Sequence, residues 1–198
     1  KESGAHLLDT ALATSMLSEG QKDAVRESLT GRGRFVAVQG SAGTGKTTML
    51  KTLVKQAAKH GYTVDGLAPS LEAVRNLAEG VPDARTLQSV LLRADHRQAA
   101  DDKSKAVLVV DEASMVSSRD MQSLITLANR SGYARVVLVG DVKQLDAVGA
   151  GAPFHQLQKA GLRTAIMTDI QRQRYDTLRA AVNHTINSEV QQAFQKIG

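Results

Sequence analysis

The fold of this chain is decided by one stretch of sequence, Gly40-Ser41-Ala42-Gly43-Thr44-Gly45-Lys46-Thr47. The apolar run Arg34 to Gln39 precedes it and an amphipathic stretch near Lys46 to His60 follows, so it joins a strand to a helix. Glycines at this spacing let the backbone wrap around phosphates, and amides at a helix N-terminus favour negative charge. The pattern is that of a P-loop, and it predicts a nucleotide-binding segment that extends to Thr48.

Two side chains of this segment carry separate roles. Lys46 is expected to reach the β- and γ-phosphates, and Thr47 is expected to hold Mg²⁺. An ordinary glycine-rich turn is the alternative. The strand before the segment and the helix after it favour the nucleotide site.

A pair of carboxylates follows a second buried run, Ala106 to Val110. In open α/β sheets ligands collect at the carboxyl ends of the strands, so Asp111 is expected to hold Mg²⁺ beside the P-loop. Glu112 is placed to orient or deprotonate an attacking water, which distinguishes a hydrolase from a kinase. The alternative is that Asp111 and Glu112 are a simple helix-capping acidic pair.

A third strand end carries Gln144, in Gly140-Asp141-Val142-Lys143-Gln144-Leu145. Gln144 could reach the γ-phosphate, although taken alone this segment is more often a surface turn. Three strand ends that converge on one phosphate site are harder to dismiss than any one of them.

The chain as a whole alternates short β-branched runs with amphipathic stretches, which is typical of βαβ units. We therefore expect one α/β domain over residues 1–198, with three layers around a mainly parallel sheet. The expected strands are Arg34 to Gln39, Thr63 to Ala68, Ala106 to Val110, Arg135 to Val139 and Thr164 to Met167. The expected helices lie near Lys46 to His60, Ser70 to Glu79, Arg119 to Arg130 and Pro153 to Ala160.

The flanks and one insertion complete this organisation. Ser18 can cap a helix over about 18–29, and the C-terminal tail over about 175–197 has helical spacing. The polar segment Arg93 to Lys105 is expected to be a loop or a small excursion at the rim of the sheet. The chain begins at Lys1 rather than Met, so we expect a fragment of a longer protein.

Composition narrows the class of partner. A net charge of +5 suits a polyanion, but the basic residues are scattered and most of them suit an ordinary solvated surface. The absence of cysteine fits a reducing compartment, and the apolar runs are too short to span a membrane, so the cytoplasm is the expected location.

Taken in order, GSAGTGKTT, DEAS, GDVKQL and QRQR resemble the motifs of superfamily 1 DNA helicases of the RecD type. The similarity is closest to the helicase region of conjugative relaxase-helicases, and it covers nearly the whole chain from Ser18 onward. It implies a RecA-like P-loop NTPase domain that is the first of two motor lobes. The expected ligands are ATP, Mg²⁺ and single-stranded DNA, with movement from 5′ to 3′, and the expected partner is a second RecA-like lobe of the same parent chain.

The resemblance also assigns roles to single residues. Gln21 matches a glutamine that recognises adenine, with a solvent-exposed helix glutamine as the alternative. Ser70 and Thr86 match elements that contact DNA phosphates, but Gln88 stands where many relatives have histidine. Arg172 matches the arginine that completes the γ-phosphate site, and Arg174 competes for that role.

Two other classes of function stay open on the residues alone. A nucleotide or small-molecule kinase would need an arginine-bearing lid and has no reason to combine Asp111 and Glu112 with Gln144. A catalytically silent DNA-binding or regulatory module is the stronger competitor. The isolated lobe is expected to bind nucleotide, to hydrolyse it poorly and to fail to unwind DNA.

Overall fold

The computed structural model describes residues 2–95, 102–141 and 152–168, and its centre is one parallel sheet. Six strands lie in the order β3-β2-β4-β5-β1-β6, and every pair among the described strands is parallel. The strands are β1 (Phe35–Gly40), β2 (Thr63–Ala68), β3 (Ala84–Thr86), β4 (Ala106–Val110), β5 (Arg135–Gly140) and β6 (Thr164–Met167). All five residues of β4 are buried, as expected for a strand covered on both faces.

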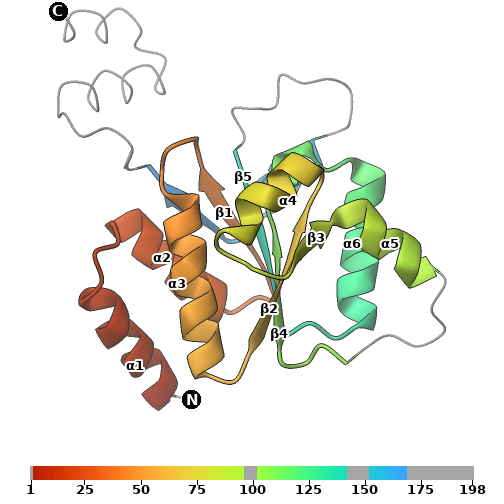
Figure 1. Cartoon of the computed structure of the whole chain (residues 1–198). Helices are drawn as coiled ribbons and strands as arrows, with labels where there is room; N and C mark the ends of the chain where they lie inside the picture. The colour runs from red at the N-terminus through yellow and green to blue at the C-terminus, as the bar shows by residue number, and fades with distance from the viewer. Residues whose placement is uncertain (1, 96–101, 142–151, 169–198) are drawn as a thin grey trace, which may run out of the picture.

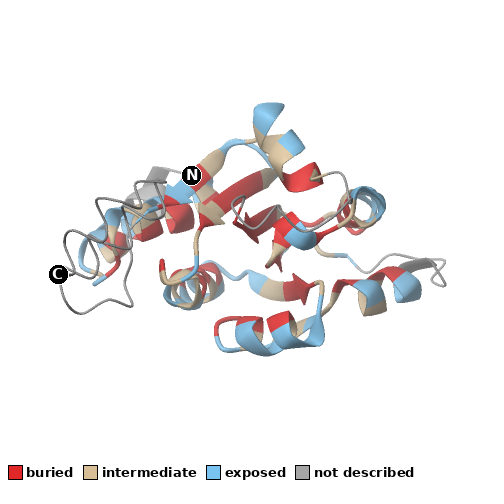
Figure 2. Ribbon diagram, turned by 90° about the horizontal axis from the view of Figure 1, so that it is seen from above, coloured by how far each residue is buried: buried red, intermediate tan, exposed pale blue. Residues whose placement is uncertain are grey.

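Helices cover both faces of this sheet (Figure 1). One face packs against α1 (Glu2–Ala13), α2 (Glu19–Thr30), α3 (Lys46–Lys59) and α4 (Leu71–Ala78). The other face packs against α5 (Leu87–Asp95), α6 (Ser118–Arg130), α7 (Pro153–Lys159) and the short 3₁₀ helix η1 (Ala113–Met115). Figure 2 shows buried strands between helices whose outer faces are exposed. The three-layer α/β prediction is confirmed, with a fully parallel sheet among the described strands.

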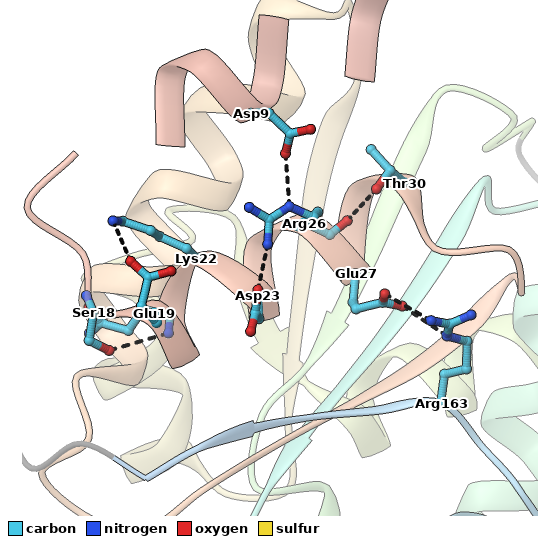
Figure 3. Close-up of polar contacts among 10 residues, drawn as sticks. Asp9, Ser18, Glu19, Lys22, Asp23, Arg26, Glu27, Thr30 and Arg163 are labelled. Atoms are coloured by element: carbon cyan, nitrogen blue, oxygen red, sulfur yellow. Dashed lines mark hydrogen bonds and ion pairs between the residues drawn. The ribbon is translucent and has the colours of Figure 1, made fainter. Parts of the chain in front are cut away.

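Helix α2 is the N-terminal helix expected from the sequence, and it is held at its start and along its sides. The Ser18 hydroxyl accepts the Gln21 N–H and the Gln21 side chain accepts the Ser18 N–H, which is a capping box. Arg26 pairs with Asp9 of α1, and Glu27 pairs with Arg163 before β6 (Figure 3). These contacts hold α2 against α1 and against the start of β6.

Four elements were not expected from the sequence: α1, β3, α5 and η1. Strand β3 has three residues, so it is too short to show an alternating pattern. Among the described strands it pairs with β2 alone. Helix α5 buries Leu87 and Leu91, four residues apart. The prediction of a loop from Arg93 to Lys105 is therefore wrong for its first three residues, which form the last turn of α5. The expected C-terminal helix over 175–197 lies outside the described residues.

In the described part of the chain, no helix combines the length and the apolar character needed to cross a membrane.

Candidate functional site

The P-loop leaves β1 at Gly40 and enters α3 at Lys46. Gly43 and Gly45 have φ of 84° and 80°, in the left-handed region that favours glycine. Between them the Thr44 hydroxyl donates to the Ser41 carbonyl at 2.8 Å, which closes the loop on itself. The Lys46 ammonium donates to the Gly40 carbonyl at 2.9 Å, so its charge lies over the loop.

Gly40 is a glycine for a different reason from Gly43 and Gly45, which is the close approach of neighbouring atoms. A Cβ at this position would lie 2.8 Å from the Thr44 Oγ1 and 3.3 Å from the Met167 Cβ on the neighbouring strand β6. Any side chain here would push against the hydroxyl that closes the loop. The P-loop is thus shaped by β6 as well as by its own sequence.

The N-terminus of α3 faces this loop without a side-chain cap. Its N-cap is Gly45, which has no side chain to accept the first amides of the helix. Thr47 is half-buried and Thr48 is exposed, both in the first helical turn. Ser41 and Gly43 are half-buried and Ala42 is exposed, so the segment expected to hold phosphates is accessible.

The contacts of Gln21 differ from those expected from the sequence. Its side chain is 3% exposed, so the interpretation as a solvent-exposed helix glutamine is wrong. The side-chain amide donates to the carbonyls of Thr44 and Gly45 at 3.2 and 3.1 Å, while its oxygen accepts the Ser18 N–H at 2.9 Å. Both amide hydrogens are therefore committed to the P-loop backbone. In this arrangement the first task of Gln21 is to hold the loop.

The acidic pair follows β4, which lies between β2 and β5, and it therefore lies at the same carboxyl edge of the sheet as the P-loop. Asp111 is buried, and its Oδ1 accepts the Glu112 N–H at 2.9 Å. Burial raises the pKa of the Asp111 carboxyl, and this hydrogen bond and the Lys46 charge offset part of the rise. Burial also raises the pKa of Glu112, again against the opposing charge of Lys46. The charge of Lys46 therefore acts on both carboxylates.

The backbone of Glu112 is strained. Its φ is 50°, in a region that non-glycine residues rarely adopt, and it lies between the end of β4 and the start of η1. Its Oε2 is buried and has no hydrogen-bond partner among the described residues. A carboxylate that is held in a costly conformation and left unpaired is typical of a functional group rather than of a helix cap. The alternative interpretation, that the acidic pair merely caps a helix, does not fit Glu112.

Asp141 and Ser114 were not singled out from the sequence. Asp141 follows β5, is 5% exposed, and its negative charge adds to the rise in the Glu112 pKa. The Ser114 Oγ is buried without a hydrogen-bond partner in the described structure, two residues after Glu112. A polar residue directly after a buried strand is the sequence signal that could have identified Asp141.

The residues present fit a nucleoside triphosphate with Mg²⁺. The left-handed glycines and the uncapped start of α3 suit phosphates, and Lys46 supplies the cation. Thr47 and Asp111 offer the oxygen ligands that Mg²⁺ prefers. The unpartnered Glu112 oxygen leaves an acceptor for a polar ligand such as water.

Ser70 and Thr86 lie at neighbouring strand ends, because Ala68 of β2 pairs with Thr86 of β3. Each hydroxyl oxygen also caps the following helix: Ser70 accepts the Ala73 N–H at 3.1 Å and Thr86 accepts the Ser89 N–H at 3.3 Å. Helix capping by these two residues was not predicted from the sequence. It uses only a lone pair and leaves each O–H group able to donate.

Three expected site residues, Gln144, Arg172 and Arg174, lie outside the described residues. The structure thus brings together Gln21, the P-loop, Asp111 and Glu112, and it places Ser70 and Thr86 along the same edge of the sheet.

A family described as "AAA domain" matches residues 16–198 of the chain. The chain belongs to the AAA domain family. The match begins just before Ser18 and includes the P-loop and the acidic pair, but it leaves out α1.

Relatives of this AAA domain agree with the resemblance drawn from its motifs. The chain is 39% identical to the conjugal transfer protein TraA of Agrobacterium fabrum, over 89% of its length. It is 36% identical to the multifunctional conjugation protein TraI of Escherichia coli K12, and 37% identical to the ATP-dependent RecD2 DNA helicase of Deinococcus radiodurans, over 89% and 79% of its length. It spans only 16%, 10% and 22% of these three proteins, respectively.

Solved structures agree on the fold. Unliganded Pif1 from Bacteroides sp. matches 89% of this AAA domain and 47% of the Pif1 chain, with a TM-score of 0.59 and 23% identity. The RecA-like P-loop NTPase fold expected from the sequence is confirmed.

Proposed function

We propose that this chain is the first, ATP-binding motor lobe of a DNA helicase, which couples ATP hydrolysis to movement along single-stranded DNA from 5′ to 3′ during conjugation. The observation that carries this proposal is Glu112: its Oε2 is buried without a hydrogen-bond partner among the described residues, its backbone is strained, and the charge of the P-loop lysine acts on it. A general base needs an oxygen that is free to accept a hydrogen bond from the attacking water, and a raised pKa brings the base closer to neutral pH.

The proposed division of labour follows from the site. Gly40 to Thr48 bind the phosphates, Lys46 neutralises their charge, and Thr47 and Asp111 hold Mg²⁺, which when bound stabilises charge on the phosphate oxygens. Glu112 orients and deprotonates the attacking water. On the strength of the family motifs, Gln144 contacts the γ-phosphate and Arg172 stabilises the charge that develops during transfer. Gln21 holds the loop, and the adenine contact that the resemblance implies is the alternative role for this side chain.

Single-stranded DNA is the proposed track, and Ser70 and Thr86 are its proposed phosphate contacts. Their adjacent strand ends support a continuous contact line, and hydroxyl donors to phosphates bind without reading sequence. The proposed partner is a second RecA-like lobe of the parent chain that completes the site. We place this work in the cytoplasm, where a conjugative motor would meet plasmid DNA.

ATP turnover with and without single-stranded DNA tests the proposal. The chain is compared with a longer version that includes the next lobe, and each is prepared with Glu112→Gln and with Glu79→Gln, an exposed carboxylate after α4, as the matched control. DNA-stimulated turnover only in the longer form, lost in Glu112→Gln and kept in Glu79→Gln, supports the motor. If neither form hydrolyses ATP although both bind DNA, the chain is a catalytically silent DNA-binding module instead.

A further inference from the structure

A cavity of about 750 Å³ lies at the edge of the sheet opposite the P-loop. It is lined where α2 and α3 end and where β1, β4 and β5 begin. In Figure 1, α3 runs from the P-loop at the top to this lower edge. Strand β1 has six residues, so the two edges are about 20 Å apart at roughly 3.3 Å per residue. An occupant of this cavity would not touch a nucleotide in the P-loop.

The cavity has an apolar lining with one aromatic residue. Leu29, Ala57 and Val107 come from three different elements and contribute carbon surface. Tyr62, directly before β2, lines the cavity and is 38% exposed. The volume is within the roughly 300–1,000 Å³ of small-molecule pockets, so the cavity is large enough for one nucleotide unit.

Three arginines also line the cavity. Arg32, Arg34 and Arg135 line the cavity together with His60, and no acidic side chain of the described residues does. Arg34 donates to the Asn129 Oδ1 at 3.0 Å and Arg135 donates to the Gly33 carbonyl, so neither of these two contacts neutralises a charge.

Among the described residues, Glu27 is the acid that acts on Arg135, and it does not balance that charge. Glu27 attracts Arg135, but Glu27 already pairs with Arg163 (Figure 3). The Arg163 Nε lies 3.0 Å from the Glu27 Oε2, and the Arg163 Nη2 donates to the Glu27 Oε1 at 3.0 Å. Burial lowers the pKa of Arg135, so its charge is held at a cost that Glu27 only partly offsets.

Helix dipoles are the ordinary reason for cations at such an edge, but they are too small here. Helices α2 and α3 both end at the cavity, and each helix C-terminus carries about −0.5 of a charge. Together they account for about one of the three arginine charges. A net positive cavity with an apolar lining and an aromatic ring remains.

We propose that this cavity binds one nucleotide unit of a single-stranded nucleic acid, with the base against Tyr62 and its phosphates on Arg32, Arg34 and Arg135. Guanidinium groups match phosphate oxygens in a forked geometry, and bases of any sequence stack on an aromatic ring. The site goes beyond the proposed motor track, because Ser70 and Thr86 lie at the other edge of the sheet. It would hold a strand that has left that track or has not yet entered it.

The test measures binding of a fluorescent oligothymidylate to the whole chain without ATP. Tyr62→Leu removes the ring, Tyr62→Phe keeps it, and Arg32→Gln removes one cation. Arg130→Gln changes an exposed arginine of α6 outside the cavity and is the matched control. Thermal unfolding and ATP binding report whether each variant is folded.

The expected result is a loss of affinity of about fivefold or more for Tyr62→Leu, since one base–aromatic stack is lost. Tyr62→Phe and Arg130→Gln are expected to bind like the original chain. Arg32→Gln is expected to reduce the slope of log affinity against log salt by about 0.7, as one phosphate contact is lost.

Three results would overturn the proposal. In the first, Tyr62→Leu and Arg32→Gln bind the oligonucleotide as the original chain does. In the second, an abasic phosphodiester competes as well as the oligothymidylate, which excludes the base. In the third, polyglutamate displaces the oligonucleotide at equal affinity, which assigns the cavity to an acidic protein segment. Because no ATP is needed, failure here differs from failure of the motor, which Ser70→Ala with Thr86→Ala and the turnover assay address.

Discussion

Replacing Gln21 by alanine should loosen the P-loop without changing which base it prefers. The substitution removes three hydrogen bonds of a side chain that is 3% exposed, two of them to the Thr44 and Gly45 carbonyls. At about 1 kcal/mol each, the free energy of unfolding should fall by about 2–4 kcal/mol once the small cavity is included. This is a large share of the roughly 5–15 kcal/mol that stabilises a domain.

Nucleotide affinity should fall by the same factor for every nucleotide. If about 1.4 kcal/mol of the lost free energy is needed to reshape the loop for phosphates, each Kd rises about tenfold. The assay is calorimetric titration of ATP, GTP and inorganic triphosphate, with urea unfolding of the same samples. Gln122→Ala, at an exposed position of α6, is the matched control and should leave all values unchanged.

A selective result would refute this reasoning. If Gln21→Ala weakens ATP binding but leaves GTP and triphosphate binding unchanged, then Gln21 reads the base and its contacts to the loop are incidental. Gln21→Glu sharpens the comparison, because it keeps an acceptor for the Ser18 N–H but turns an oxygen toward two carbonyls. It should weaken triphosphate binding at least as much as Gln21→Ala does.

Three further predictions concern other parts of the same structure. Burial raises the folded pKa of Glu112 above its ordinary 4.5, so the folded state binds the proton more tightly, and stability falls as pH rises from about 4.5 through the folded pKa. In thermal unfolding without nucleotide, Glu112→Gln should therefore melt at a higher temperature than the original chain at neutral pH, and the difference should vanish below pH 4.5. Equal melting temperatures at all pH values would contradict the raised pKa. Gly40→Ala places a Cβ 2.8 Å from the Thr44 Oγ1 and should cost about 1–3 kcal/mol of stability together with nucleotide affinity, measured by unfolding and titration; unchanged affinity would show that the loop moves aside freely. Tyr133→Phe removes a 2.7 Å hydrogen bond to the Asp65 carboxylate, and it should lower the free energy of unfolding in urea by about 1.5–3 kcal/mol while ATP binding stays unchanged. No change in the urea midpoint would mean that the ion pair with Lys103 is sufficient to stabilise the buried side of Asp65 without the tyrosine.

Much of the fold could be predicted because its signals are local. The apolar run of β4 and the run of β5 are buried on both faces, and their strand character is visible in four or five consecutive residues. The capped start of α2 was likewise visible at Ser18. Strand β3 was missed because three residues carry no period, and α1 because it lies before the first recognisable motif.

The candidate site also has parts that local sequence predicts and parts that it does not. The P-loop and the two acids are short segments whose residue types and spacing already specify phosphate and metal chemistry. Their convergence was predicted from the rule that parallel strands share one carboxyl edge, which β1, β4 and β5 obey. The partner of Gln21 was not predictable, since it contacts residues 23 and 24 positions away.

By itself, the sequence determined the chemistry: glycines that admit phosphates, a lysine, and a carboxylate pair after a buried strand, all set by covalent order. Tertiary contacts were needed to show that Glu112 is strained, that its Oε2 has no hydrogen-bond partner among the described residues, and that Gln21 donates to the P-loop backbone. They were also needed to show that three arginines and Tyr62 line one cavity at the far edge of the sheet. Burial and charge balance at a residue depend on side chains brought together from separate elements, and no window of sequence contains those neighbours.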